Sequence, residues 1–196
     1  MFRIPLLIAV ALAVAFGLGI LTSVWAMRAT VGFGAIALGP WVAFPQAQTA
    51  GADPYAKAHR ARDGKLLFGS AEGLAFTAVS DSEGRTLSAA CSYSIAGITP
   101  PARFWTLHAA GPDGMPLAPP PGRPASVNSW SVLRGSDSNF DIRISAGAQA
   151  GNWLAIPGTA RSFHLVLTLL DTPTAGSSGV VDLAMPIVTR TGCADA

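Results

Sequence analysis

Charge is scarce in this 196-residue chain: only 12% of its residues are charged, and the formal net charge is +2. No cluster of Lys and Arg is present that could neutralise a row of phosphates, which argues against a nucleic-acid partner. Acidic residues number only 11 and stand mostly in turn-like sequences. Sequence spacing does not decide whether two of them meet in space as a catalytic pair.

Familiar catalytic motifs are also missing. The segment Gly69–Gly73 places its serine outside the Gly-x-Ser-x-Gly pattern. Residues Asp137–Asp141 match the first half of a calcium loop, but Ile142 and Ala148 occupy the positions that need glycine and glutamate. The three histidines stand alone in sequence, at His59, His108 and His164. We therefore expect no metal centre and no cofactor, and the sequence assigns no catalytic residue.

Cysteine occurs only twice, at Cys91 and Cys193, without a CxxC motif or further ligands that would indicate a metal site. In a cytosolic protein the two could be unrelated buried thiols, whereas an even number in an oxidising compartment favours a disulfide. We expect the bridge. It would close a loop of about 100 residues and stabilise the fold by up to ~4–5 kcal/mol.

One long uncharged run extends from Ile4 to Ala26, between Arg3 and Arg28. As a helix rising about 1.5 Å per residue, it is long enough to cross the ~30 Å hydrocarbon core of a membrane. A cleaved signal sequence and an uncleaved anchor both remain open. The apolar stretch is longer than signals use, and Trp25 suits an interfacial anchor. We predict that residues 1–28 are a transmembrane anchor, or uncleaved signal, that contacts membrane lipid.

A short soluble helix is expected next, because Asp53 can cap it, Pro54 suits its first position and Gly64 can end it. Its basic residues are Lys57, His59, Arg60 and Arg62. They indicate either a solvated surface or a contact with anionic lipid or a partner. Residues 29–52 are expected to be juxtamembrane, and within them Val31–Phe44 is either part of that linker or a first, glycine-interrupted strand.

From Gly73 onward the apolar residues recur with a period of two, typical of strands. Leu74–Val79 and Thr86–Ile95 flank the turn Asp81–Gly84 and predict a hairpin. Further strands are expected at Arg103–Ala109, Trp130–Leu133, Phe140–Ser145, Phe163–Leu170 and Met185–Arg190. Short strands without long helices between them predict an all-β fold, an antiparallel sandwich or barrel, over residues 53–196.

Several segments, in this order, resemble the bacterial family catalogued as domain of unknown function 1214, over roughly Asp53 to Cys193. They are Asp53–Tyr55, Ala71–Leu74, Asp81–Arg85, Cys91–Tyr93, Pro101–Thr106, Gly151–Leu154 and Pro186–Arg190. The resemblance implies a jelly-roll-like antiparallel β-sandwich, an N-terminal helix and a cysteine near each position found here. It also implies association with a companion, domain of unknown function 1254, often on the same chain. We expect a single-domain member, and the family brings no established reaction.

The candidate ligand-binding residues are Arg103, Trp105, Asn152 and Trp153, because aromatic rings beside Asn or Arg can stack on a sugar. The two tryptophans could instead fill the ends of the core.

The leading hypothesis is a non-catalytic binding or protein-interaction module of the cell envelope. It is expected in the bacterial inner membrane as a single-pass protein with its C-terminal domain in the periplasm. The alternative is an enzyme acting on a carbohydrate or small ligand, in a cleft near Trp105 and Trp153 where His108 or His164 could converge.

Overall fold

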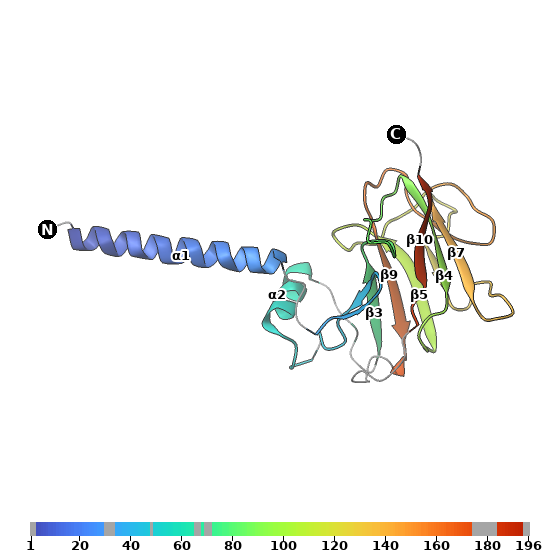
Figure 1. Cartoon of the computed structure of the whole chain (residues 1–196), viewed down its shortest axis with the longest axis horizontal. Helices are drawn as coiled ribbons and strands as arrows, with labels where there is room; N and C mark the ends of the chain where they lie inside the picture. Colours follow the sequence, from blue (N-terminus) through green and yellow to red (C-terminus); the bar gives the residue numbers. More distant parts are fainter. Residues whose placement is uncertain are drawn as a thin grey trace.

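The computed structural model describes residues 3–29, 34–47, 49–64, 68, 72–173 and 184–193, so Ala71 of the family-like sequence lies outside it. The helices are α1 (Arg3–Ala29) and α2 (Pro54–Asp63). The strands are β1 (Ile36–Leu38), β2 (Trp41–Ala43), β3 (Gly73–Ala78), β4 (Cys91–Gly97), β5 (Phe104–Ala110), β6 (Ser126–Asn128), β7 (Phe140–Ser145), β8 (Asn152–Ala155), β9 (His164–Leu170) and β10 (Ile187–Cys193). Helix α1 projects from a body made mostly of strands, and α2 lies beside the C-terminal end of α1 (Figure 1).

Helix α1 is long and apolar enough to cross a membrane over Arg3–Met27, with a mean hydropathy of 2.7 and none of it buried against the rest of the described chain. Signal sequences share these features. The two hydroxyl side chains near its end are satisfied within the helix: Thr22 donates to the Leu18 carbonyl at 2.7 Å, and Ser23 to the Gly19 carbonyl at 2.8 Å. An apolar surface on all sides is typical of a helix surrounded by lipid.

Helix α2 begins and ends where local chemistry predicts. The Asp53 carboxylate accepts the backbone N–H of Tyr55 at 2.8 Å and of Ala56 at 3.1 Å, which satisfies two donors at the helix start. Gly64 takes a left-handed conformation with φ of 62°, and its N–H donates to the Arg60 carbonyl. The sequence-based prediction of this helix is confirmed.

The body consists of two facing sheets, a six-stranded one in the order β1-β2-β3-β9-β5-β6 and a four-stranded one in the order β10-β4-β7-β8. Apolar side chains from both sheets fill the space between them. The largest of these fully buried side chains are Trp41, Phe76, Leu87, Tyr93, Ile95, Leu107, Ile142, Ile144, Leu154, Ile156, Phe163 and Leu165. The predicted mostly-β, two-sheet architecture is confirmed, and β9 lies centrally between β3 and β5, as its two apolar faces indicate.

Two strand predictions are wrong. The expected hairpin pairs Leu74–Val79 with Thr86–Ile95, but β3 and β4 belong to different sheets. Next to the turn the two segments are joined by a bridge between Ser80 and Thr86 and by the Leu87 N–H, which donates to the Val79 carbonyl at 3.2 Å. The chain crosses from one sheet to the other after this bridge. Residues Trp130–Leu133 form a turn after β6 rather than a strand. Alternation of apolar residues fixes which face is buried, but it does not choose the partner strand.

The antiparallel prediction is wrong for one pair, because β7 and β8 run parallel, with Ile142 opposite Asn152 and Ser145 opposite Ala155. The six residues 146–151 return the chain to the start of β7. Gly151, with φ of 77°, makes the final turn before β8 in a conformation that glycine adopts without strain. The other described pairs are antiparallel.

The large sheet begins ahead of Asp53. Strands β1 and β2 form a hairpin, and β2 pairs with β3, so the first-strand interpretation of Val31–Phe44 applies from Ile36 onward, residues 31–33 lying outside the described chain. Trp41 on β2 is fully buried, and its indole N–H donates to the Pro186 carbonyl at 2.8 Å. This bond joins the N-terminal hairpin to the segment that leads into β10 in the other sheet.

Candidate interaction site

The loop 129–134, which follows β6, presents the two most exposed large apolar side chains in the described part of the sandwich. Trp130 is 85% exposed and Leu133 is 68% exposed. Large aromatic side chains in soluble domains are normally mostly buried. We call this segment the Trp130 loop.

The base of the Trp130 loop is fixed to β5 and β6 by hydrogen bonds. The Asn128 side-chain oxygen accepts the N–H groups of Trp130 and Ser131, both at 3.0 Å. The Ser129 N–H donates to the Trp105 carbonyl at 3.0 Å. Val132, only 9% exposed, packs into the core between the two exposed residues. The loop is therefore held in one conformation by its own turn residues.

A second set of bonds ties the loop to the four-stranded sheet through Asn152, the first residue of β8. Its side-chain oxygen accepts the Leu133 N–H at 2.6 Å, and its amide nitrogen donates to the Leu133 carbonyl at 2.8 Å. The same nitrogen donates to the Asp141 carbonyl at 3.0 Å. Asn152 thus pairs with Leu133 as a neighbouring strand would.

Aromatic rings support the loop on both faces of β5. The Trp130 ring meets the Phe104 ring edge-on, with centroids 4.9 Å apart. On the buried face, Trp105 packs on Phe140 at 5.4 Å, and the Arg134 guanidinium lies 5.4 Å from the Phe140 ring and 5.9 Å from the Trp105 ring. Such contacts favour a defined relative orientation of the side chains.

Of the four residues predicted to bind a ligand, Trp105 and Asn152 contact this loop. Trp105 is only 2% exposed, and Trp153 is half-buried and donates its indole N–H to the Ser145 carbonyl at 3.2 Å. The Arg103 side chain is 83% exposed, 3.7 Å from the Asp171 carboxylate. Trp105 and Asn152 hold the Trp130 loop from below.

None of those four residues lines either of two hollows in the described part of the chain. One of about 540 Å³ is lined by Ala96, Gly97, Gly135, Asn139, Phe140, Asp141 and Ile187. The other, of about 390 Å³, is lined by Leu38, Gly39, Pro40, Ser82, Met185, Pro186 and Ile187. Both are shallow and carry few polar groups that converge on a point.

Sequence reasoning missed Trp130 and Leu133 because it assigned them to a strand. The available signal was the run Asn128-Ser129 just before Trp130, since Asn and Ser favour side-chain bonds to the backbone of a turn. Exposure itself carries no sequence signal, because it depends on which other segments pack nearby.

His108 and His164 come close on the outer face of the large sheet. In the register of β5 and β9, His108 lies opposite Val166 and His164 lies opposite Ala110, so the two histidines are diagonal neighbours. Burial lowers the pKa of His108 below its ordinary value of 6.5. Within the described residues, no group of three or more His, Cys, Asp and Glu side chains could hold a metal ion.

A buried carboxylate, Asp81, anchors the turn that follows β3. It is 1% exposed and accepts the N–H groups of Glu83 at 3.1 Å and Arg85 at 2.9 Å, and the Arg85 Nε–H at 2.9 Å. Burial disfavours its charged form, but the hydrogen bonds and charge of Arg85 outweigh this and hold the pKa of Asp81 below 3.8. A carboxylate so fully bonded serves structure rather than proton transfer.

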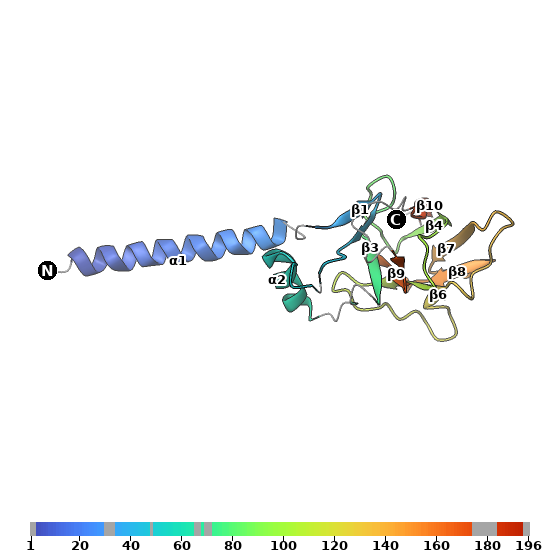
Figure 2. The same ribbon diagram turned by 90° about the horizontal axis from the view of Figure 1, so that it is seen from below.

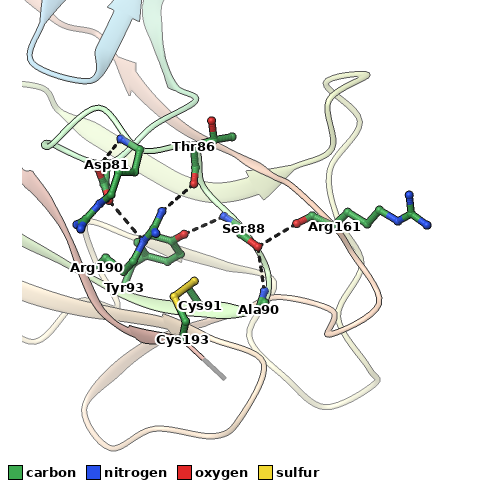
Figure 3. The surroundings of a disulfide bond; sticks show 10 residues. Asp81, Thr86, Ser88, Ala90, Cys91, Tyr93, Arg161, Arg190 and Cys193 are labelled. Carbon is green, nitrogen blue, oxygen red and sulfur yellow. Dashed lines mark hydrogen bonds and ion pairs between the residues drawn. A yellow bond between two sulfur atoms is a disulfide. The ribbon is translucent and has the colours of Figure 1, made fainter. Parts of the chain in front are cut away.

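The same turn is joined to the C-terminal strand, as Figure 3 shows. Arg190 on β10 lies 3.6 Å from the Asp81 carboxylate, donates to the Thr86 carbonyl at 2.9 Å and stacks over the Tyr93 ring at 5.6 Å. Further along β10, the expected disulfide joins Cys193 to Cys91, its direct partner on β4. Both features hold the last strand in its sheet.

These observations define a mostly-β, two-sheet sandwich with a disulfide, preceded by an apolar helix. The chain belongs to the family described as "Protein of unknown function (DUF1214)", whose pattern matches residues 72–174, just over half of its length. The resemblance inferred from the sequence is confirmed. No curated protein matches the chain.

One solved structure supports the same architecture. The crystal structure of the VPA0106 protein from Vibrio parahaemolyticus has a TM-score of 0.58 and 20% sequence identity, and covers 74% of this chain but only 37% of the Vibrio chain. An uncharacterised protein from Burkholderia cenocepacia has a TM-score of 0.40 and 14% identity, covering 60% of this chain and 28% of that one. The chain therefore spans well under half the length of both structures.

Proposed function

We propose that this protein is a membrane-anchored, non-catalytic interaction module of the bacterial cell envelope, with a jelly-roll-like sandwich that docks a partner protein through the Trp130 loop. The partner we propose carries the companion domain of unknown function 1254 that the family resemblance implies.

The proposed location rests on two features, helix α1 and the disulfide. Helix α1 exposes apolar side chains on all sides, and the disulfide between Cys91 and Cys193 is a bond that persists in oxidising compartments such as the periplasm. An anchor in the inner membrane with the sandwich in the periplasm accounts for both features.

The observation that carries the docking role is the exposure of Trp130 on a rigid loop. Binding hot spots are enriched in Trp, Tyr and Arg, and a pre-ordered loop loses little conformational entropy on binding. Trp130 and Leu133 provide such a surface. β6 and β8, which flank the loop, lie at the end of the sandwich away from α1 (Figure 2). A partner can therefore reach the loop without meeting the membrane.

The identity of the partner is supported by the lengths of the related chains. In the Vibrio structure this fold accounts for 37% of the chain, so the same fold is accompanied there by additional polypeptide. A module with an exposed aromatic anchor fits docking onto a protein that supplies the companion domain.

The test uses the full-length protein in mild detergent and a purified protein from the same genome that carries the companion domain. We expect a complex that elutes as one species, and binding weakened about 30-fold or more in Trp130→Ala, the loss typical of a hot-spot residue. Met115→Ala, which removes another apolar side chain that is 65% exposed, is the matched control and should bind as the parent does. Equal binding by Trp130→Ala, or no complex at micromolar concentrations, would overturn the proposal.

A further inference from the structure

Helix α2 carries an excess of positive charge. Lys57 and Arg62 are exposed, while His59 and Arg60 are half-buried. In the described part of the chain, Lys57, Arg60 and Arg62 make no ion pair. The carboxylate of Asp53 is occupied by the backbone N–H groups that it caps.

Two of these cations also fix α2 to the chain before it. The Lys57 ammonium donates to the Ala50 carbonyl at 3.0 Å, and the Arg60 guanidinium donates to the Ala47 carbonyl at 2.9 Å. Neutral carbonyl groups do not cancel the charge. The cations are therefore held in place and still attract an anion.

The position of α2 follows from its contacts with α1. Both views place α2 beside the C-terminal end of α1, between that end and the sandwich (Figures 1 and 2). With 27 residues, α1 is about 40 Å long, whereas the hydrocarbon core is about 30 Å thick. If α1 spans the membrane, its last turns lie among the lipid headgroups.

Two aromatic side chains near the end of α1 and the start of α2 are typical of residues at the level of the lipid headgroups. Trp25 is 72% exposed close to the end of α1, and Tyr55 is 36% exposed in the first turn of α2. Trp and Tyr are enriched where a membrane protein crosses from hydrocarbon to water. This position brings α2 and its cations close to the phosphate groups at the surface of the membrane.

From this charge and this position we propose that α2 binds the headgroups of anionic phospholipids, and so holds the sandwich close to the membrane at a fixed height. Basic residues near a negatively charged lipid surface are attracted to it within about one Debye length. The inference rests on the anchoring role of α1 and is independent of the docking role of the Trp130 loop.

The test compares the full-length protein in nanodiscs of phosphatidylcholine alone with nanodiscs that also contain phosphatidylglycerol. We expect amide hydrogen exchange in α2 to slow at least threefold with the anionic lipid, and this protection to disappear in 0.5 M salt, where the Debye length is about 4 Å. Lys57→Gln combined with Arg62→Gln should abolish the protection. Arg123→Gln combined with Arg161→Gln, which removes the same charge from exposed positions on the sandwich, should leave it intact.

Equal exchange of α2 in both lipids, or full protection in the Lys57→Gln, Arg62→Gln variant, would overturn the inference. Alkaline extraction of the protein from membranes of the same lipids distinguishes loss of the α2 contact from failure of the anchor. A chain that resists extraction but shows no lipid-dependent exchange keeps the anchoring proposal and refutes the α2 contact. A chain that extraction releases refutes both.

Discussion

The side chain of Asn152 makes both hydrogen bonds to the backbone of Leu133 that a neighbouring strand would make, at 2.6 and 2.8 Å. Through this pairing, β8 fixes the loop that exposes Trp130. A residue predicted to contact a ligand thus also fixes the shape of an exposed surface.

Replacing Asn152 with Ala should lower the free energy of unfolding by about 2–3 kcal/mol, because three hydrogen bonds are lost at about 1 kcal/mol each. Urea denaturation measures the change, and hydrogen exchange of the Leu133 amide should accelerate. Asn139→Ala, which removes an exposed amide bonded to Asp137, is the control and should change stability by less than about 1 kcal/mol. An unchanged Leu133 amide would contradict the proposed role of Asn152.

Asp81→Asn should destabilise the fold by about 2–4 kcal/mol near neutral pH, because it removes the charge that faces Arg85 and Arg190 in a buried position. Asp113→Asn, at an exposed carboxylate that accepts one turn N–H, is the control and should have little effect.

The effect of Asp81 depends on pH in a defined direction. Its pKa is lowered by folding, so its contribution is fully present above the unfolded value of about 3.8 and is lost as the pH falls through the lower folded value. The difference in urea midpoint between the parent and Asp81→Asn should therefore be constant above about pH 5 and shrink below pH 3.8. A difference that stays the same at pH 3 would show that the charge of Asp81 is not what stabilises the turn.

Removing the disulfide with Cys91→Ala and Cys193→Ser should lower stability by about 2–5 kcal/mol, since the bridge closes a loop of 102 residues in sequence. Intact-mass measurement on the membrane fraction, after treatment with a thiol reagent, shows whether the two cysteines are bonded. We expect a thiol reagent to add no label before reduction and two labels per chain after it. Two labels without reductant would mean that the protein resides in a reducing compartment.

How far the sequence predicts this molecule depends on whether a feature is local. The start and end of α2 were predictable because Asp53 and Gly64 act on backbone groups within four residues. The buried faces of β7 and β9 were predictable because side chains alternate along any strand. The partner of β3 was not, because β9 lies about 90 residues away in sequence and any strand edge offers the same hydrogen-bonding groups.

The candidate site likewise combines residues that the sequence singled out with contacts that it did not predict. Sequence singled out Trp105 and Asn152, and the structure places both at the base of the Trp130 loop. Their contacts with that loop could not be predicted, because they require β5, β6 and β8 to meet from separate parts of the chain.

The sequence by itself determined an apolar helix at one end, a capped basic helix after it and a set of strands with known inner faces. Each of these follows from interactions among near neighbours in the chain. Only the tertiary structure decided that β7 and β8 run parallel, that Asp81 meets Arg190 and that Trp130 faces solvent. These relationships depend on which distant segments pack together, and that choice is made by the burial of the whole core rather than by any local pattern.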